Sequence, residues 1–217
     1  MLAGRLETLI DEWALQDQDP EDRYITSGIS WQYYETLLDK LGDSAGVRVT
    51  YFDGVLEIVS PSRRHESGKT RIGTLLEIYF LETDTDYFPL GSTTLRSLTT
   101  LSGTEPDESY CIGEERALPD LVVEVIATSG GVNKLAVYGR LGIPEVWFWQ
   151  DEHLSLYHRR EQTPLQFKQT YGYEPVARSE LLPDLDIALL TECIQQPNPL
   201  AAAKEFRSRL REQRNPS

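Results

Sequence analysis

Several features that mark specialised protein classes are scarce in this sequence of 217 residues. It has only two cysteines, Cys111 and Cys193, which excludes a disulfide-stapled scaffold and a zinc module held by cysteines. No apolar run approaches the roughly 18 residues that a membrane-spanning helix needs. The first residues turn acidic at Glu7, unlike a secretory signal, so we expect a cytoplasmic protein.

Basic residues are also few, with 21 Lys and Arg against 35 Asp and Glu and a net charge of -14. Because neutralising phosphates requires Lys and Arg, this charge argues against non-specific binding of nucleic acid. Two local clusters leave room for such binding. One comprises Arg63, Arg64, Lys69 and Arg71, and the other is the segment 200–217, with five basic residues against two acids.

The sequence lacks internal repeats, a Ser–His–Asp order, a glycine-rich phosphate loop and an H-E-x-x-H motif. Its apolar fraction of 40% and charged fraction of 26% are ordinary for a soluble globular protein with a full core. The length predicts a single domain.

The periodicity of the apolar residues predicts a mixed α/β fold. Helices are expected at residues 6–15, 30–42, 62–80, 133–141 and 199–213. Strands are expected at residues 47–52, 55–59, 86–89, 94–98, 108–112, 121–126, 145–149, 155–158 and 166–171. Asp53-Gly54 predicts a tight turn between the first two strands. Residues 121–149 form a strand–helix–strand unit, which predicts parallel neighbours, and the last two strands are expected to pair antiparallel.

Glu124 interrupts a run of apolar residues that predicts a central strand. A carboxylate there costs several kcal/mol unless it is paired, protonated or bound to a cation. It is therefore either half of a salt bridge at a strand end, or a metal ligand or catalytic acid. Asp107 at a strand start and Glu57 on the hairpin could converge on it, whereas Asp120 is expected to be a solvated cap.

Cationic side chains near these acids suggest phosphate chemistry. Lys134 opens the helix after the Glu124 strand, where its ammonium could position an attacking water or stabilise charge developing at phosphorus. His65 begins a helix beside Arg63 and Arg64, and a helix start of this kind suits a phosphate. The alternatives are a solvated lysine and a structural histidine. A Mg²⁺ ion, which one or two carboxylates can hold, would explain the acids.

Together these residues resemble the PD-(D/E)XK nuclease superfamily and, more narrowly, the Uma-two family within it. The resemblance covers about residues 25–190 and rests on the hairpin 52–62 followed by His65, on Glu105-Pro106-Asp107, on the strand with Glu124, on the helix with Lys134 and Tyr138, and on the segment 141–147. The superfamily pattern places a lysine two residues after the glutamate, where this chain has Ile126. The Uma-two pattern places it in the following helix, where Lys134 matches.

The resemblance implies an α/β (α+β) fold with a restriction-endonuclease-like core, in which helices flank a central mixed β-sheet. It also implies hydrolysis of phosphodiester bonds in DNA that depends on Mg²⁺ or Mn²⁺, with Asp107 and Glu124 as metal ligands. Lys134 and Glu57 would join these two as catalytic residues. The substrate would contact His65, Arg63, Arg64 and Tyr138. The core would span residues 25–195, between a helical extension at 1–24 and a basic helical tail at 196–217.

Two other functions fit the same residues. A binding or regulatory protein could have kept a nuclease fold without catalysis, because fold alone does not fix function. A phosphoesterase acting on a small nucleotide or on single strands would need no large basic surface. For a DNA endonuclease, a homodimer could align the basic clusters along one groove. The nuclease hypothesis predicts that Asp107 and Glu124 lie on adjacent strands, with Glu57 in the same cleft and the Lys134 ammonium directed at Glu124.

Overall fold

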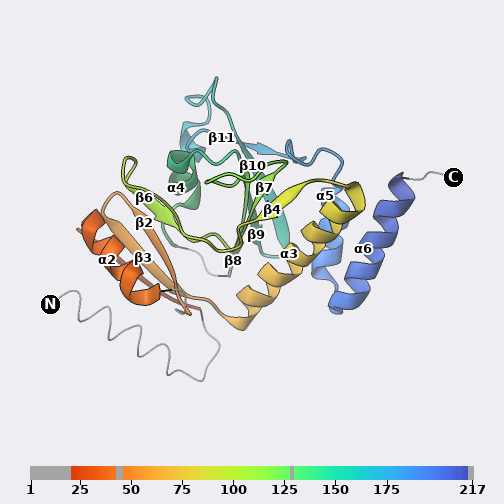
Figure 1. Cartoon of the computed structure of the whole chain (residues 1–217), viewed down its shortest axis with the longest axis horizontal. Coiled ribbons are helices and arrows are strands. Elements are labelled where there is room, and N and C mark those ends of the chain that lie inside the picture. Colours follow the sequence, from red (N-terminus) through yellow and green to blue (C-terminus); the bar gives the residue numbers. More distant parts are fainter. Residues whose placement is uncertain (1–20, 43–45, 128–129, 215–217) are drawn as a thin grey trace.

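The computed structural model describes residues 21–42, 46–127 and 130–214, which form two β-sheets flanked by helices (Figure 1). The helix predicted at residues 6–15, and with it most of the expected extension at 1–24, lies outside the described residues. Within the described part, no helix combines the length and apolar character needed to cross a membrane.

The first sheet is antiparallel and has the strand order β1-β3-β2-β6-β5. Its strands are β1 (Asp22–Ser27), β2 (Arg48–Phe52), β3 (Val55–Ser60), β5 (Leu95–Ser97) and β6 (Ser102–Thr104). The predicted turn joins β2 to β3 at Asp53 and Gly54, which both have positive φ angles of 51° and 85°. Such a turn favours Asp-Gly because its two central residues lie in the left-handed region.

Helix α2 (Trp31–Leu41) packs on this sheet through Trp31, Tyr34 and Leu37. It begins at Ser30, whose hydroxyl accepts a hydrogen bond from the Tyr33 amide at 3.2 Å, as an N-cap does.

The second sheet is mixed and has the order β11-β10-β9-β8-β7-β4. Its strands are β4 (Tyr87–Pro89), β7 (Glu108–Ile112), β8 (Leu121–Ile126), β9 (Glu145–Gln150), β10 (His153–Arg159) and β11 (Tyr173–Val176). As predicted, β8 and β9 are parallel, and helix α4 (Lys134–Leu141) connects them. The other pairings in this sheet are antiparallel.

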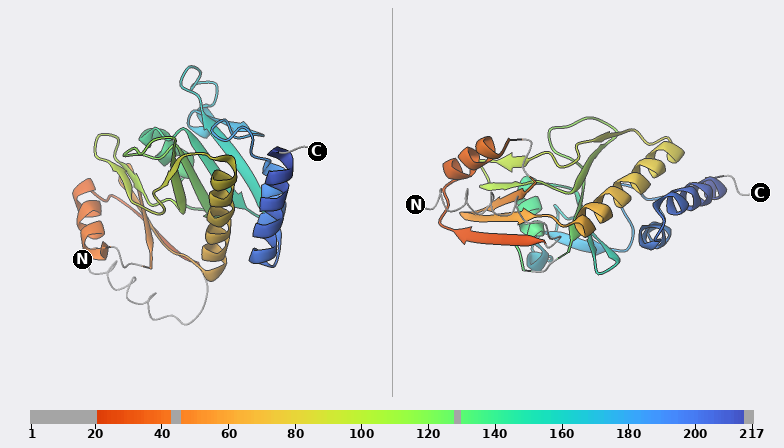
Figure 2. Two further views of the ribbon diagram at one scale, coloured as in Figure 1. Left: turned by 45° about the vertical axis from the view of Figure 1, so that its right-hand side comes forward. Right: turned by 90° about the horizontal axis from the view of Figure 1, so that it is seen from below.

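Alternate residues of β8 point into two different cores. Val123 packs with Ile72 and Phe206 on the face covered by α3 (Arg63–Thr83), α5 (Ile187–Gln195) and α6 (Pro199–Arg214). Val122 packs with Tyr138 of α4 on the opposite face. Figure 2 shows α3 and α6 side by side on the first of these faces. Since Glu124 has the parity of Val122, its side chain lies on the α4 side.

The fold class is confirmed, but the β-structure is divided into two sheets rather than one. The strand predicted at 166–171 is wrong, because this polar segment contains the 3₁₀ turn η2 (Lys168–Thr170). The true partner of β10 is β11, which starts after Gly172. Strands β1 and β6 and helix α5 were not predicted from the sequence.

The basic C-terminal segment forms α6, which is bound to α3 by ion pairs. Arg207 and Arg211 contact the Glu82 carboxylate at 2.6 and 2.7 Å, and Arg214 lies 3.1 Å from Asp84. Three of the five basic residues of this segment are thus already paired within the chain.

Candidate active site

A cavity of about 350 Å³ lies where the two sheets meet. Strands β8, β9 and β10 contribute residues to it from the second sheet, and β1, β2 and β3 contribute residues from the first. The start of α4 and the loop before it complete the lining. Glu57, His65, Glu124 and Lys134, which the sequence singled out from four separate segments, all line this cavity.

Asp107 directly precedes β7, the strand beside β8, and does not itself line the cavity. The antiparallel ladder pairs Glu108 with Val123, so Asp107 is opposite Glu124 at its next step. The Val125 amide donates to Asp107 Oδ2 at 2.6 Å and holds the carboxylate beside β8. Both carboxylates are buried, with Asp107 fully inaccessible and Glu124 only 5% exposed.

Lys134 and Tyr138 approach Glu124 from one face of α4. The Lys134 ammonium lies 3.1 Å from Glu124 Oε1 and donates to Thr104 Oγ1 at 2.8 Å. The Tyr138 hydroxyl, four residues further along the helix, donates to the same carboxylate oxygen. Asn133 caps the helix by accepting from the Ala136 amide, which sets the position of both side chains. The contact expected between Lys134 and Glu124 is therefore present.

Asp107 also contacts two basic side chains, those of His65 and Arg48. His65 Nε2 lies 2.7 Å from Asp107 Oδ1, and its Nδ1 lies 3.2 Å from Glu21 Oε2. The Arg48 guanidinium lies 3.2 Å from the same Asp107 oxygen and 2.8 Å from Glu66. His65 is thus bound between two carboxylates and positions Asp107.

Glu57 is only 2% exposed and faces the cavity from β3. Arg23 Nε lies 3.4 Å from its Oε1, and the Val132 amide donates to that oxygen at 3.3 Å. A Cβ atom at Gly131 would overlap the side chains of Glu57 and Arg23. This glycine therefore permits the loop before α4 to lie directly against Glu57.

The titration behaviour of the site follows from burial and close partners. Burial raises the pKa of Glu124, the negative charge of Asp107 adds to the rise, and Lys134 and Tyr138 offset part of it. Burial would also raise the pKa of Asp107, but His65 and Arg48 outweigh it and hold that pKa below its usual value. For His65, burial lowers the pKa, yet the hydrogen bonds to Asp107 and Glu21 raise it to about 9.

Residues 31–190, about three quarters of the chain, match the model of the Uma2 (Uma-two) family, whose description is "Putative restriction endonuclease". The chain belongs to the Uma-two family. No curated protein matches the sequence. The family description supports a nuclease activity in general terms.

Carboxylate oxygens, which Mg²⁺ and Mn²⁺ prefer as ligands, are present at Asp107 and Glu124. Mg²⁺ commonly takes one or two carboxylates together with waters and phosphate oxygens, so these two residues could hold such an ion. The raised pKa of Glu124 reflects a carboxylate that burial deprives of water, and a cation would favour its charged form. Among residues 21–42, 46–127 and 130–214, no three His, Cys, Asp or Glu side chains form a ready-made metal cluster.

The remaining residues predicted to bind substrate do not line the cavity. Arg63 and Arg64 are exposed at the start of α3 and do not line the cavity. Tyr138 is fully buried behind Glu124. Their roles in substrate binding stay predictions. Asp120 is not the solvated cap expected, because it is only 7% exposed and accepts from the Ile112 amide at 2.8 Å.

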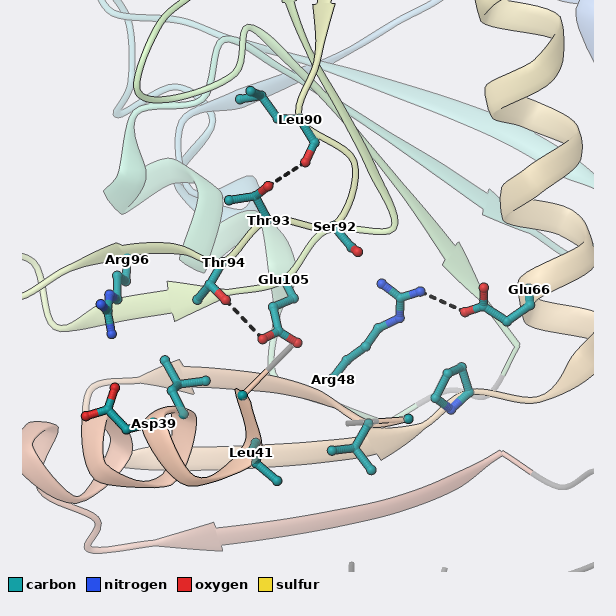
Figure 3. Close-up of a pocket in the computed structure, with 15 residues that line it drawn as sticks. Asp39, Leu41, Arg48, Glu66, Leu90, Ser92, Thr93, Thr94, Arg96 and Glu105 are labelled. Carbon is teal, nitrogen blue, oxygen red and sulfur yellow. Dashed lines mark hydrogen bonds and ion pairs between the residues drawn. The ribbon is translucent and has the colours of Figure 1, made fainter. Parts of the chain in front are cut away.

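A larger groove of about 1050 Å³ adjoins the cavity and shares Arg48 with it (Figure 3). Arg48 reaches across this groove to Glu66, while Thr94 donates to Glu105 on its other side at 3.1 Å. Two arginines and three acids, Arg48, Arg96, Asp39, Glu66 and Glu105, line the groove. The cavity is the stronger candidate for phosphate chemistry, because it brings the Lys134 ammonium to the Glu124 carboxylate.

Sequence reasoning missed Arg48, Arg23 and Glu21. Arg48 gave little signal, because a polar residue between Val47 and Val49 is the ordinary alternation of a half-buried strand, whereas Glu124 interrupts a continuous apolar run. The other two flank or lie within β1, whose residues lack clear apolar alternation.

Proposed function

We propose that this Uma-two chain is a metal-dependent endonuclease that hydrolyses phosphodiester bonds in DNA. The observation that supports it most strongly is that Asp107, directly before β7, lies in register with Glu124 of β8, and that the Lys134 ammonium is 3.1 Å from Glu124. The family description supports the coarser assignment to nucleases.

In this proposal, Asp107 and Glu124 hold Mg²⁺ or Mn²⁺. When bound, such an ion supplies positive charge to the scissile phosphate and lowers the pKa of a water molecule. Tyr138 and the Val125 amide fix the orientation of the two carboxylates.

Lys134 has the best position to act on the reacting groups. Thr104 accepts from its ammonium at 2.8 Å, so the charge is held at a fixed place beside Glu124. From there it can orient the attacking water or stabilise the additional negative charge on the phosphoryl oxygens. His65 and Arg48 are positioning residues, because both hold Asp107 Oδ1.

The test is cleavage of plasmid and oligonucleotide DNA with Mg²⁺, with Mn²⁺ and with a chelator. We expect cleavage by the wild-type chain only with metal, and loss of cleavage in Glu124→Gln and Asp107→Asn. Glu108→Gln is the matched control, because Glu108 is the next residue after Asp107 but lies against Gly73 of α3. It should cleave at the wild-type rate.

Two results would contradict the proposal. One is the absence of metal-dependent cleavage of any DNA by the folded wild-type chain, which would favour a binding or regulatory protein. The other is undiminished cleavage by Glu124→Gln and Asp107→Asn.

A further inference from the structure

One end of the cavity is aromatic and has no part in the chemistry proposed above. Across the sheet, Glu124 of β8 pairs in register with Phe148 of β9, and Phe148 pairs with Ser155 of β10. Neighbouring strands lie about 4.8 Å apart, so Phe148 is one strand spacing from the catalytic carboxylate and Ser155 is two. All three residues line the same cavity.

Tyr157 enlarges this aromatic end. Its ring meets the Phe148 ring edge to face, with centroids 5.7 Å apart and planes at 77°. Both side chains line the cavity and are half-buried, so a ligand can reach them. Val132 and Leu135 add apolar surface from the opposite wall, while Gln150 and Ser155 provide polar groups at the edge.

The cavity therefore has an ionic end and an aromatic end within one strand spacing of each other. A nucleotide has the matching chemistry, because it joins an anionic phosphate to a flat base with polar edges. The volume of about 350 Å³ is within the range of small-molecule sites, near its lower limit. A base inside an intact duplex cannot enter such a cavity without leaving the stack.

The net charge of the chain also favours a nucleotide that is not part of a duplex. A net charge of -14 provides little of the counterion release that drives binding of a rigid duplex. Stacking on aromatic side chains supplies affinity for single strands that is independent of sequence.

We propose that Phe148 and Tyr157 form a subsite for one unpaired nucleobase, so that the substrate is single-stranded or locally unpaired DNA. This inference rests on the proposed function for the position of the phosphate at Glu124. The base subsite itself can be tested by binding alone.

The test measures the affinity of the full chain for a short DNA strand that contains 2-aminopurine and hydrolysis-resistant phosphorothioate linkages, in buffer with Mg²⁺. We expect the single strand to bind at least tenfold more tightly than its duplex, and the 2-aminopurine fluorescence to be quenched on binding. Phe148→Leu keeps an apolar side chain but removes the ring, and should weaken strand binding about tenfold, as loss of one stacked base does.

A second variant tests the subsite in case Phe148→Leu does not fold. Ser155→Phe leaves both rings in place and fills the cavity from β10, so it should also weaken strand binding. Tyr171→Leu is the matched control, because Tyr171 is an exposed aromatic residue that does not line the cavity. It should bind the strand like the wild-type chain.

Equal affinity for duplex and single strand, or wild-type binding by both Phe148→Leu and Ser155→Phe, would overturn the inference. Binding of a nucleoside monophosphate as tightly as the strand would overturn the assignment to a DNA strand. Cleavage of duplex plasmid without any preference for single strands would refute only this inference. Quenching that depends on Phe148, without cleavage of any DNA, would support the subsite and contradict the proposed function.

Discussion

Two buried glutamates on neighbouring strands should respond differently to the same substitution. Glu145 of β9 is fully inaccessible and accepts four hydrogen bonds. Its Oε1 accepts from Trp147 at 2.7 Å and Ser179 at 2.6 Å, and its Oε2 accepts from the Glu180 amide at 3.0 Å and faces His158 at 3.0 Å. In Glu145→Gln, the new NH₂ group must face one of these pairs of donors. We expect a loss of about 2–4 kcal/mol in the free energy of unfolding.

Glu124 has a different hydrogen-bonding pattern. Tyr138 and Lys134 both donate to Oε1, so the amide oxygen of a glutamine can accept both hydrogen bonds. Glu124→Gln also removes a buried charge that lies beside Asp107, and this relief offsets the weaker attraction to Lys134. We therefore expect the free energy of unfolding to change by no more than about 1 kcal/mol in the metal-free protein.

The assay is urea denaturation of the two variants and the wild-type chain in a chelating buffer, with unfolding monitored by tryptophan fluorescence. Equal slopes of free energy against urea would show that the same folded and unfolded states are being compared. The reasoning is refuted if Glu124→Gln loses as much stability as Glu145→Gln. Glu124 would then be half of a structural ion pair, like the buried carboxylate of Glu145.

Three further variants test separate parts of the account. Lys134→Met should lower the cleavage rate by about 10²–10³-fold, measured on DNA, while metal still raises the melting temperature. Gly131→Ala should lower the free energy of unfolding by about 1–3 kcal/mol through its overlap with Glu57, with Gly46→Ala, which meets no atom within 4 Å, as control. Hydrogen bonds from Arg211 and Arg207 lower the pKa of Glu82 to about 2. The contacts of Glu82 with the two arginines therefore stabilise the fold fully above pH 4.5, and this stabilisation is lost as the pH falls through 2. The melting temperatures of wild type and Glu82→Gln should therefore converge as the pH is lowered from 5 to 2, and a constant difference would contradict the assignment.

Much of the site could be predicted because its residues lie in segments with strong local patterns. The parallel β8–α4–β9 unit follows from an apolar run, a helix stopped by Gly142 and Pro144, and a second apolar strand. That unit places Lys134 at the strand end near Glu124 without any knowledge of the rest of the chain.

Most of the unpredicted parts depend on tertiary contacts. Strand β1 has little apolar alternation and is ordered by its pairing with β3, which also brings Arg23 to Glu57. Helix α5 is only nine residues long, but its buried residues Leu189, Leu190, Cys193 and Ile194 recur at helical spacing, so its periodicity did carry a usable signal. The two-sheet arrangement depends on β6, whose Ser-Gly-Thr sequence has little strand propensity of its own.

The most direct test of the central claim is a melting experiment with increasing Mg²⁺ or Mn²⁺ on the wild-type chain, Glu124→Gln and Asp107→Asn. A cation that binds the folded site and not the unfolded chain should stabilise the wild-type protein by about 2.7 kcal/mol at a hundredfold excess over its dissociation constant. The account predicts this increment in the wild-type chain and its loss in both variants. No increment in the wild-type chain, or the same increment in all three proteins, would contradict the assignment of Asp107 and Glu124 as a metal site.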